Sequence, residues 1–290
     1  MQDDEPMSTQ PDFGEAMARW ADRNPTISGL VLIGSRERPE ADKLWRADAH
    51  SDWDFQVIAS RSKQFENGAW TKDISGFELQ AYAARTAIIG GVPKVSAVFT
   101  KAEADLVIIP AISARLLRWS IRLGLHKREG RVRRHVQDLA EVIRPGWRFL
   151  KGGEKWGKMY RRAVDDVQDP HLEDQEVRNL AESFVCDYVW TLRKIARGEL
   201  MAAQRMLFLG LAETNFRLMH ELKQRLGERT FTKARRIERL AGEEELNDLA
   251  VEAPLEETDL CAAVEKSAAT CRKLVMALID ETWHWPNVGR

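Results

Sequence analysis

The sequence LVLIGSR at residues 30–36, followed by SDWDF at residues 51–55, decides how the first half of this chain folds. Residues 27–33 are a mostly apolar run, and they predict a β-strand that ends in a turn at Gly34. Glycine tolerates backbone conformations that are closed to other residues, so the chain can turn sharply there. Residues 53–59 predict a second strand after a polar, charged connection. Two strands of one sheet are therefore expected on either side of this connection.

The second stretch carries two aspartates, Asp52 and Asp54, on either side of Trp53. Residues two apart on a strand point to the same face, so both carboxylates should lie side by side while Trp53 points to the core. Two neighbouring carboxylates are costly unless a cation lies between them. Mg²⁺ prefers oxygen ligands and often combines carboxylates with substrate phosphates. The pair therefore predicts a Mg²⁺ site.

The turn before this connection offers groups that suit an anion. A helix opening after Gly34 would present free backbone N–H groups to phosphate oxygens. The hydroxyl of Ser35 adds one more donor, and Arg36 either neutralises charge beside it or lies in solvent. Together with the aspartate pair, the turn predicts a site for Mg²⁺ and a nucleoside triphosphate. The alternative is a surface turn beside two solvated aspartates.

A hairpin further along the chain carries another aspartate that could join the pair. Two apolar runs, residues 94–99 and 104–109, flank four residues, which is a length typical of a β-hairpin. Asp105 begins the second strand, which could lie beside the strand of the aspartate pair and bring three carboxylates together. Glu103 lies two residues away on the same face and is the competing candidate, although it fits the turn better.

The character of the chain changes near residue 170. Beyond it, apolar residues recur at helical intervals, as in residues 180–195, 201–226 and 260–278. We therefore expect an α+β fold class. Residues 1–170 form a domain with a mixed sheet and flanking helices, and residues 171–290 form an all-helical bundle domain.

Composition narrows the function classes. The 290 residues carry a net charge of −1, which gives no global electrostatic reason to bind nucleic acid. Apolar runs are too short to cross a bilayer, and the acidic N-terminus does not resemble a secretory signal. The three cysteines have no metal-ligand spacing. A cytoplasmic protein without a membrane partner is expected. One local exception is the basic stretch 115–135, which predicts a solvated helix face or, alternatively, a nucleic-acid or phosphate contact.

Three motifs resemble one enzyme family: IGSR at residues 33–36, DWDF at 52–55 and ADLVIIP at 104–110. They are similar to the aminoglycoside 6-adenylyltransferase (streptomycin adenylyltransferase) family of the DNA polymerase β-like nucleotidyltransferase superfamily. That family has a Gly-Ser-Arg turn, an Asp-x-Asp pair, a later Asp-Leu-x-Leu-Ile-Pro strand and a helical C-terminal domain. Residues 184–200 resemble the start of that domain, whereas the connection between turn and pair is longer than usual.

The resemblance implies roles for these residues. Asp52, Asp54 and Asp105 would be the catalytic, metal-binding carboxylates, and the turn would bind the nucleotide through its three residues, Gly34, Ser35 and Arg36. ATP would donate AMP, with two Mg²⁺ ions, to a hydroxyl of a small acceptor such as streptomycin, and pyrophosphate would leave.

Other functions remain open at this point. The acceptor could instead be a lincosamide, another metabolite or a protein side chain, or the chain could be a non-catalytic nucleotide-binding module of the toxin–antitoxin type. Template-independent polymerisation on RNA is disfavoured by the neutral charge. A cationic acceptor would need carboxylates in the helical half, where Glu182, Asp187 and Glu213 are candidates. Asp187 is the best of them because it interrupts the apolar run 184–190.

Overall fold

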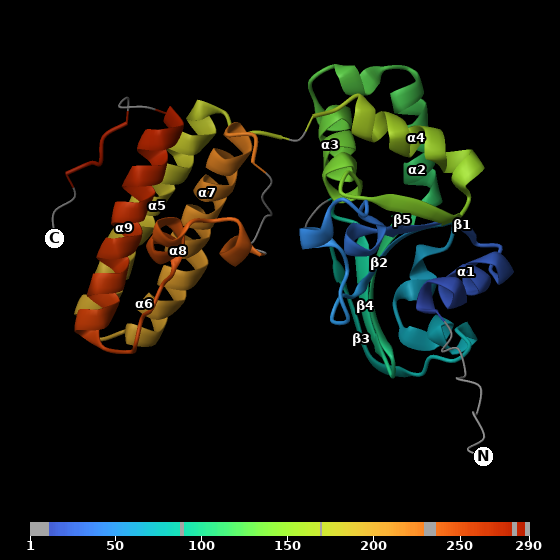
Figure 1. The fold of residues 1–290 in the computed structure, drawn as a ribbon, viewed down its shortest axis with the longest axis horizontal. Helices are drawn as coiled ribbons and strands as arrows, with labels where there is room; N and C mark the ends of the chain where they lie inside the picture. Colours follow the sequence, from blue (N-terminus) through green and yellow to red (C-terminus); the bar gives the residue numbers. More distant parts are fainter. Residues whose placement is uncertain (1–11, 88–89, 169, 229–235, 280–282, 288–290) are drawn as a thin grey trace, which may run out of the picture. The chain divides into compact units, whose positions relative to one another are not determined.

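The computed structural model describes residues 12–87, 90–168, 170–228, 236–279 and 283–287 (Figure 1). These residues form two compact units, one ending at residue 169 and the other beginning at Pro170. The first unit holds a mixed sheet with flanking helices, and the described part of the second is helical. The predicted α+β class is thereby confirmed. No helix in the described ranges is both long enough and apolar enough to span a membrane.

The sheet of the first unit has six strands. They are β1 (Ile27–Ile33), β2 (Trp53–Ala59), β3 (Leu79–Thr86), β4 (Pro93–Phe99), β5 (Ala102–Pro110) and β6 (Trp147–Lys151). The order across the sheet is β3-β4-β5-β2-β1-β6, and every neighbouring pair is antiparallel except β2 with β5. The predicted strands 27–33 and 53–59 and the hairpin of β4 with β5 are confirmed. The edge strand β3 was not predicted.

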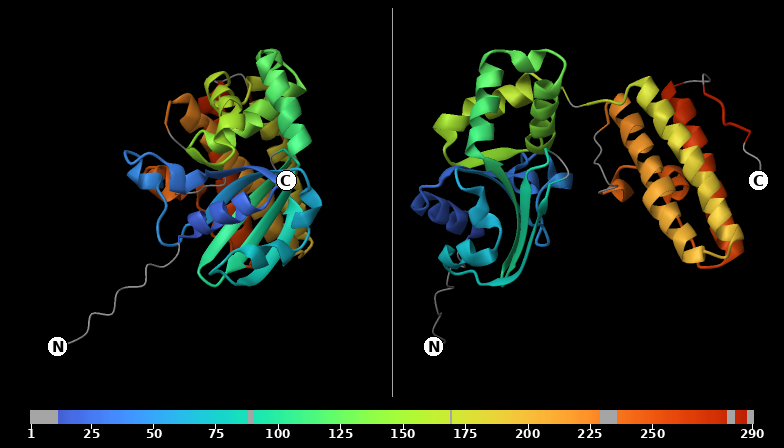
Figure 2. Two further views of the ribbon diagram at one scale, coloured as in Figure 1. Left: turned by 90° about the vertical axis from the view of Figure 1, so that its right-hand side faces the viewer. Right: turned by 180° about the vertical axis from the view of Figure 1, so that it is seen from behind.

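Helices cover both faces of this sheet (Figure 2). On one face lie α1 (Phe13–Arg23) and the 3-10 turns η3 (Ser62–Phe65) and η4 (Gly68–Asp73). On the other lie α2 (Ala111–Arg122), α3 (Arg131–Ile143) and α4 (Gly153–Asp165). Alternation along β2 sends Phe55 and Val57 into the first core and Ile58 into the second.

One buried hydrogen bond fixes α4 on the sheet. The hydroxyl of Tyr160 donates to Oε1 of Gln56 at 2.7 Å, and both side chains are buried. Burial raises the pKa of the Tyr160 hydroxyl above its usual value, so this group stays a donor. Gln56 lies two residues after Asp54 in β2 and therefore on the same face. Helix α4 covers that face at Gln56, while Asp54 stays half-exposed.

The second unit is built from α5 (Asp174–Ala196), α6 (Leu200–Met206), the π-helical segment η6 (Leu207–Ala212), α7 (Glu213–Arg225), α8 (Glu243–Leu249) and α9 (Glu257–Ile279). Its core contains the residues whose spacing predicted helices, among them Phe184, Leu211 and Leu218. The helical periodicity expected beyond residue 170 is confirmed. The π-helical segment was not predicted.

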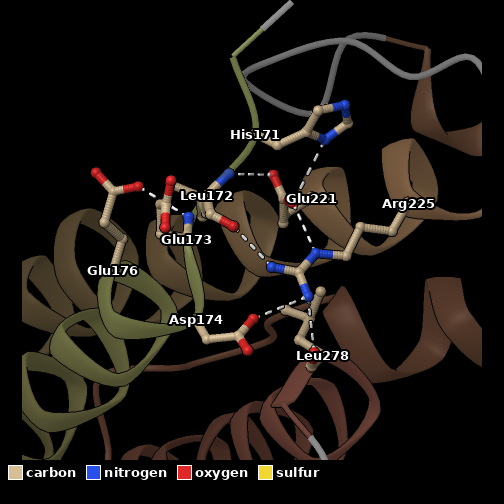
Figure 3. A network of polar contacts seen from close by, with 8 residues as sticks. All are labelled: His171, Leu172, Glu173, Asp174, Glu176, Glu221, Arg225 and Leu278. Atoms are coloured by element: carbon tan, nitrogen blue, oxygen red, sulfur yellow. Dashed lines mark hydrogen bonds and ion pairs between the residues drawn. The ribbon is translucent and has the colours of Figure 1, made fainter. Parts of the chain in front are cut away.

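A polar network ties three helices of this unit together around Arg225 (Figure 3). The guanidinium donates to the carbonyl oxygens of Leu172 and Leu278 at 2.7 and 2.8 Å, and its Nε donates to Glu221 at 2.8 Å. Glu221 is 2% exposed and also accepts from the backbone N–H of Leu172 at 2.9 Å. Every charge in the network therefore has a partner within the unit, which is how a buried carboxylate becomes tolerable.

Candidate active site

Three carboxylates meet where β2 and β5 run parallel. In the register of these strands Asp54 lies opposite Asp105, and Asp52 immediately precedes β2. Each of the three residues offers a carboxylate oxygen, and these oxygens lie within 4.8 Å of one another. All three side chains are half-exposed. The strands thus bring together residues that are 51 positions apart in the sequence.

Trp53 fixes the direction of its two neighbours. Its ring packs edge-on against Phe13 of α1, with the centroids 5.7 Å apart, and it stacks on Phe55. A Cβ on Gly14 would lie only 2.7 Å from this ring, so α1 approaches it as closely as a glycine allows. Because Trp53 is held in the core, Asp52 and Asp54 are turned to the opposite face, as predicted.

Glu103, the competing third carboxylate, lies elsewhere. It pairs with Val98 near the hairpin turn and is exposed. Among the described residues, the acidic group that could hold a metal ion contains Asp105 and not Glu103. The geometry therefore favours Asp105 as the third member of the group.

Asp105 is held by polar side chains from β4 that the sequence analysis missed. Ser96 lies opposite Asp105 in the hairpin and donates to its Oδ1 at 2.5 Å. The Lys94 ammonium lies 2.5 Å from Oδ2. Arg85 of β3 in turn donates to the Ser96 hydroxyl at 2.7 Å. The signal was available, because counting the register back from the hairpin turn sets Ser96 opposite Asp105.

The Gly34 turn lies directly against this group. Gly34 has φ of +79°, a conformation that glycine adopts easily, and a Cβ there would lie 2.8 Å from Oδ2 of Asp54. The turn continues as a 3-10 helix of four residues, η1 (Gly34–Glu37), where the sequence predicted the start of a helix. The Gly34 N–H donates to the carbonyl of Gly146 at 3.2 Å, so this group is bonded within the protein.

Arg36 holds the end of the connection in place. Its guanidinium donates to the carbonyl oxygens of Ser51 and, at 3.0 Å, of Asp52, and it lies 4.1 Å from the centroid of the Trp53 ring. Burial lowers the pKa of Arg36, while the charges of Asp12 and Asp52 oppose that shift. An arginine remains protonated in such a site. Arg36 thus both orders the backbone before β2 and contributes positive charge beside the carboxylates.

The donor set fits a hard divalent cation. Carboxylate oxygens are the ligands that Mg²⁺ prefers, and one or two of them commonly share the ion with substrate phosphates. Lys94 and Arg36 place two positive charges beside the three carboxylates, and Arg85 brings a third through its hydrogen bond to Ser96. Asp52, Asp54 and Asp105 are the residues that would hold Mg²⁺.

Three carboxylates of the second unit were predicted as acceptor-binding candidates. Glu182 and Glu213 are exposed on α5 and α7. Asp187 is half-buried, and burial raises the pKa of its carboxyl group. A Cβ on Gly210, within the π-helical segment, would lie 3.1 Å from Oδ2 of Asp187. Helical segments of this type frequently occur at functional sites, so Asp187 is the strongest of the three candidates.

Comparisons with known proteins give matches among the solved structures. No family model matches the sequence, and no curated protein does. The chain is similar to the crystal structure of an aminoglycoside 6-adenyltransferase from Bacillus subtilis, with 12% identity, a TM-score of 0.39, and 96% of this chain and 94% of that chain covered. It is also similar to a nucleotidyltransferase-like protein from Exiguobacterium sibiricum 255-15, with 12% identity, a TM-score of 0.33, and 92% and 77% covered.

Proposed function

We propose that this chain transfers AMP from Mg-ATP to a hydroxyl of a small acceptor, an aminoglycoside such as streptomycin, in the cytoplasm. The observation that carries the proposal is the group formed by Asp52, Asp54 and Asp105, whose oxygens lie within 4.8 Å of one another beside the Gly34 turn. In this proposal the unit that ends at residue 169 is the nucleotidyltransferase domain, and the unit from Pro170 binds the acceptor. Modification of the antibiotic would give the cell resistance.

The chemistry follows from the residues of the group. The three carboxylates would hold two Mg²⁺ ions, which supply the positive charge and the orientation that in-line attack on a triphosphate requires. Asp105 accepts the proton of the acceptor hydroxyl, because a free hydroxyl is too weak an acid to ionise unaided. The oxygen forms a bond to the α-phosphorus of ATP, and the bond from that phosphorus to the bridging oxygen breaks. Pyrophosphate leaves with the electron pair.

Neighbouring side chains orient these groups. Lys94 and Ser96 hold the two oxygens of Asp105 and so fix the direction in which it accepts a proton. The Ser35 hydroxyl is the donor we assign to the departing pyrophosphate. Arg36 keeps Asp52 in position through the backbone carbonyl and neutralises part of the charge. Such preorganised charge stabilises a transition state without reorganisation during the reaction.

The acceptor is assigned from the helical unit. Among the described residues, no hydrogen bond or ion pair engages the Asp187 carboxylate, and its pKa is raised by burial, so a cationic partner would relieve an unfavourable charge. An aminoglycoside amine is such a partner. Glu182 would contribute a second carboxylate from the same helix.

The test measures pyrophosphate release from Mg-ATP across a panel of acceptors that includes streptomycin, other aminoglycosides and a lincosamide. We expect release with an aminoglycoside and loss of release when the metal is chelated. Asp105→Asn should abolish turnover, whereas Glu103→Gln, an acid-to-amide change on the same strand, should keep it. The reverse result would make Glu103 the third carboxylate. If none of the acceptors in the panel supported pyrophosphate release while ATP still bound, the chain would be a non-catalytic nucleotide-binding module instead.

A further inference from the structure

A second charged region of the first unit lies outside the carboxylate group. Residues 111–165, which hold α2, α3, β6 and α4, contain 15 lysines and arginines against five aspartates and glutamates. The whole chain has a net charge of −1, so this excess is local. The basic stretch 115–135 lies within this region, and its sequence predicted a solvated helix face or, alternatively, a nucleic-acid or phosphate contact. The packing of α2 against α4 gives the charge a more specific arrangement.

Five of these cations surround one hollow between α2 and α4. The hollow measures about 570 Å³, and its cationic lining is Arg118, Arg122, Lys155, Lys158 and Arg162. Its base is apolar, because Ile121 and Met159 line it and are 2% and 4% exposed. The volume lies within the range of small-molecule sites in proteins, about 300–1,000 Å³.

Most of this positive charge has no counter-charge among the residues that the structure describes. Within the described residues, the carboxylate that pairs with a lining cation is Asp166, which lies 3.1 Å from Arg162. Arg118 donates to the backbone carbonyl of Lys155 at 3.1 Å, which fixes its direction but leaves its charge. Cations gathered around one hollow repel each other, so an anion with several charges would relieve this repulsion.

An aromatic ring completes the lining. Trp119 is 52% exposed, and the Arg122 guanidinium lies 5.2 Å from its ring centroid. A large aromatic ring half in solvent provides a flat surface on which a nucleobase can stack. The hollow therefore combines a polycationic wall with a stacking surface.

We propose that the α2/α4 hollow is an accessory binding site for a free nucleoside polyphosphate. The lining cations hold the phosphates, and Trp119 carries the base. A single-stranded nucleic acid is a poorer fit, because proteins that bind such strands use a groove with several aromatic residues in succession. Here the cations converge on one hollow, and Trp119 is the one strongly exposed aromatic residue on the described helices α2 to α4. The proposal does not depend on the activity of the carboxylate group.

Calorimetric titration of the full chain in EDTA tests this site without the metal that the carboxylate group needs. The probes are ATP, inorganic tripolyphosphate and a thymidylate dodecamer. The variant Arg122→Gln/Lys158→Gln removes two exposed cations of the hollow. Its matched control, Arg131→Gln/Arg134→Gln, removes two exposed cations of α3, so the net charge changes equally. Thermal unfolding of each variant checks that the fold is intact.

We expect one ATP per chain and at least about tenfold weaker binding of ATP and tripolyphosphate in the hollow variant, since charge-assisted contacts are lost. The control should change binding by less than about twofold, and Asp54→Asn should not change it. Trp119→Ala should weaken ATP several-fold and leave tripolyphosphate unaffected.

Four results would overturn the proposal. The first is that ATP does not bind, and the second is that the α3 control loses as much ATP affinity as the hollow variant. The third is that Asp54→Asn loses ATP binding. The fourth is that the dodecamer binds more tightly than ATP and that its binding depends on α3 as well as on the hollow. The last would indicate a nucleic-acid surface.

Discussion

Two charged clusters of this protein differ in how their charge is balanced. In the Glu221–Arg225 network of the second unit, the Glu221 carboxylate is 2% exposed. It accepts hydrogen bonds from Arg225 and from a backbone N–H, and Arg225 also donates to backbone carbonyl oxygens (Figure 3). The group formed by Asp52, Asp54 and Asp105 is half-exposed, and it brings three carboxylates of like charge within 4.8 Å of one another. A buried network of opposite charges is satisfied within the protein, whereas a half-exposed group of like charges offers its oxygens to a cation.

This difference separates charged clusters that stabilise the fold from clusters that can bind a ligand. A buried ion pair with every bond satisfied contributes to the fold, because breaking it strands a charge in a poorly hydrated place. A cluster of like charges reduces stability by its repulsion and persists when a ligand repays that cost. Substitutions in the two clusters should therefore have opposite consequences for activity and stability.

Asp54→Asn should have the largest effect on turnover. We expect turnover to fall by at least about a thousandfold, roughly 4 kcal/mol in the barrier, because a ligand of the metal and its charge are lost. Stability should stay unchanged or rise, since one of three repelling charges is removed. Pyrophosphate release and urea unfolding measure the two quantities. A clear loss of stability with activity retained would make this cluster structural, like the Arg225 network.

Arg225→Met should act in the opposite way. We expect a loss of about 3 kcal/mol in the free energy of unfolding, because the buried Glu221 carboxylate loses its cation. Turnover of the folded fraction should stay close to that of the unmodified protein. Arg217→Met, an exposed arginine on the same helix, is the control and should cost less than about 0.5 kcal/mol. Equal costs for both variants would contradict the difference between the clusters.

Lys94→Met tests how much the ammonium beside Asp105 contributes to the carboxylate group. Removal of the ammonium leaves Asp105 with Ser96 and makes the group more negative. We expect turnover to fall about tenfold, roughly 1.4 kcal/mol, because Asp105 is less well oriented. The Mg²⁺ concentration for half-maximal activity should also fall, since a more negative site attracts the ion more strongly. Lys101→Met, an exposed lysine of the same hairpin, should alter neither value.

Asp187→Asn should give the smallest effect on stability. Burial raises the pKa of Asp187, so folding favours its protonated form. The stabilisation is complete below the unfolded pKa of about 4 and is lost as the pH rises through the folded pKa. The amide variant should thus be more stable at pH 7 by a few tenths of a kcal/mol, since solvent screens a half-exposed group. Unfolding measured at pH 3 and pH 7 checks this. A variant less stable at pH 7 would mean that the carboxylate has a partner.

Local sequence patterns predicted the parts of the fold that depend on local structure. The apolar runs gave β1, β2 and the hairpin of β4 with β5, and the spacing of Asp52 and Asp54 gave their common face. The hairpin also led to the expectation that Asp105 lies beside the pair, and the parallel register of β2 with β5 agrees with it. Alternation and turn length carry such information because neighbouring residues determine both.

Contacts between distant segments were not predictable in this way. The bond from Gly34 to Gly146 joins residues 112 positions apart, and no local pattern announces it. It occupies the first N–H of the turn. Strand β3 escaped prediction because most of its side chains are exposed and alternate poorly. The roles of Lys94 and Ser96 needed the register of the hairpin as well as its existence.

The parallel pairing of β2 with β5 also bears on how the chain acquires its structure. The hairpin of β4 with β5 closes over a few residues, whereas β2 meets β5 only after about fifty intervening residues have been ordered. Contacts between residues so distant in sequence form slowly, because the chain loses the entropy of loop closure before the contacts contribute favourable free energy. A folding chain therefore holds a formed hairpin before it holds three converging carboxylates. The three carboxylates therefore come together late in folding, and the proposed metal site would be absent from a partly folded chain.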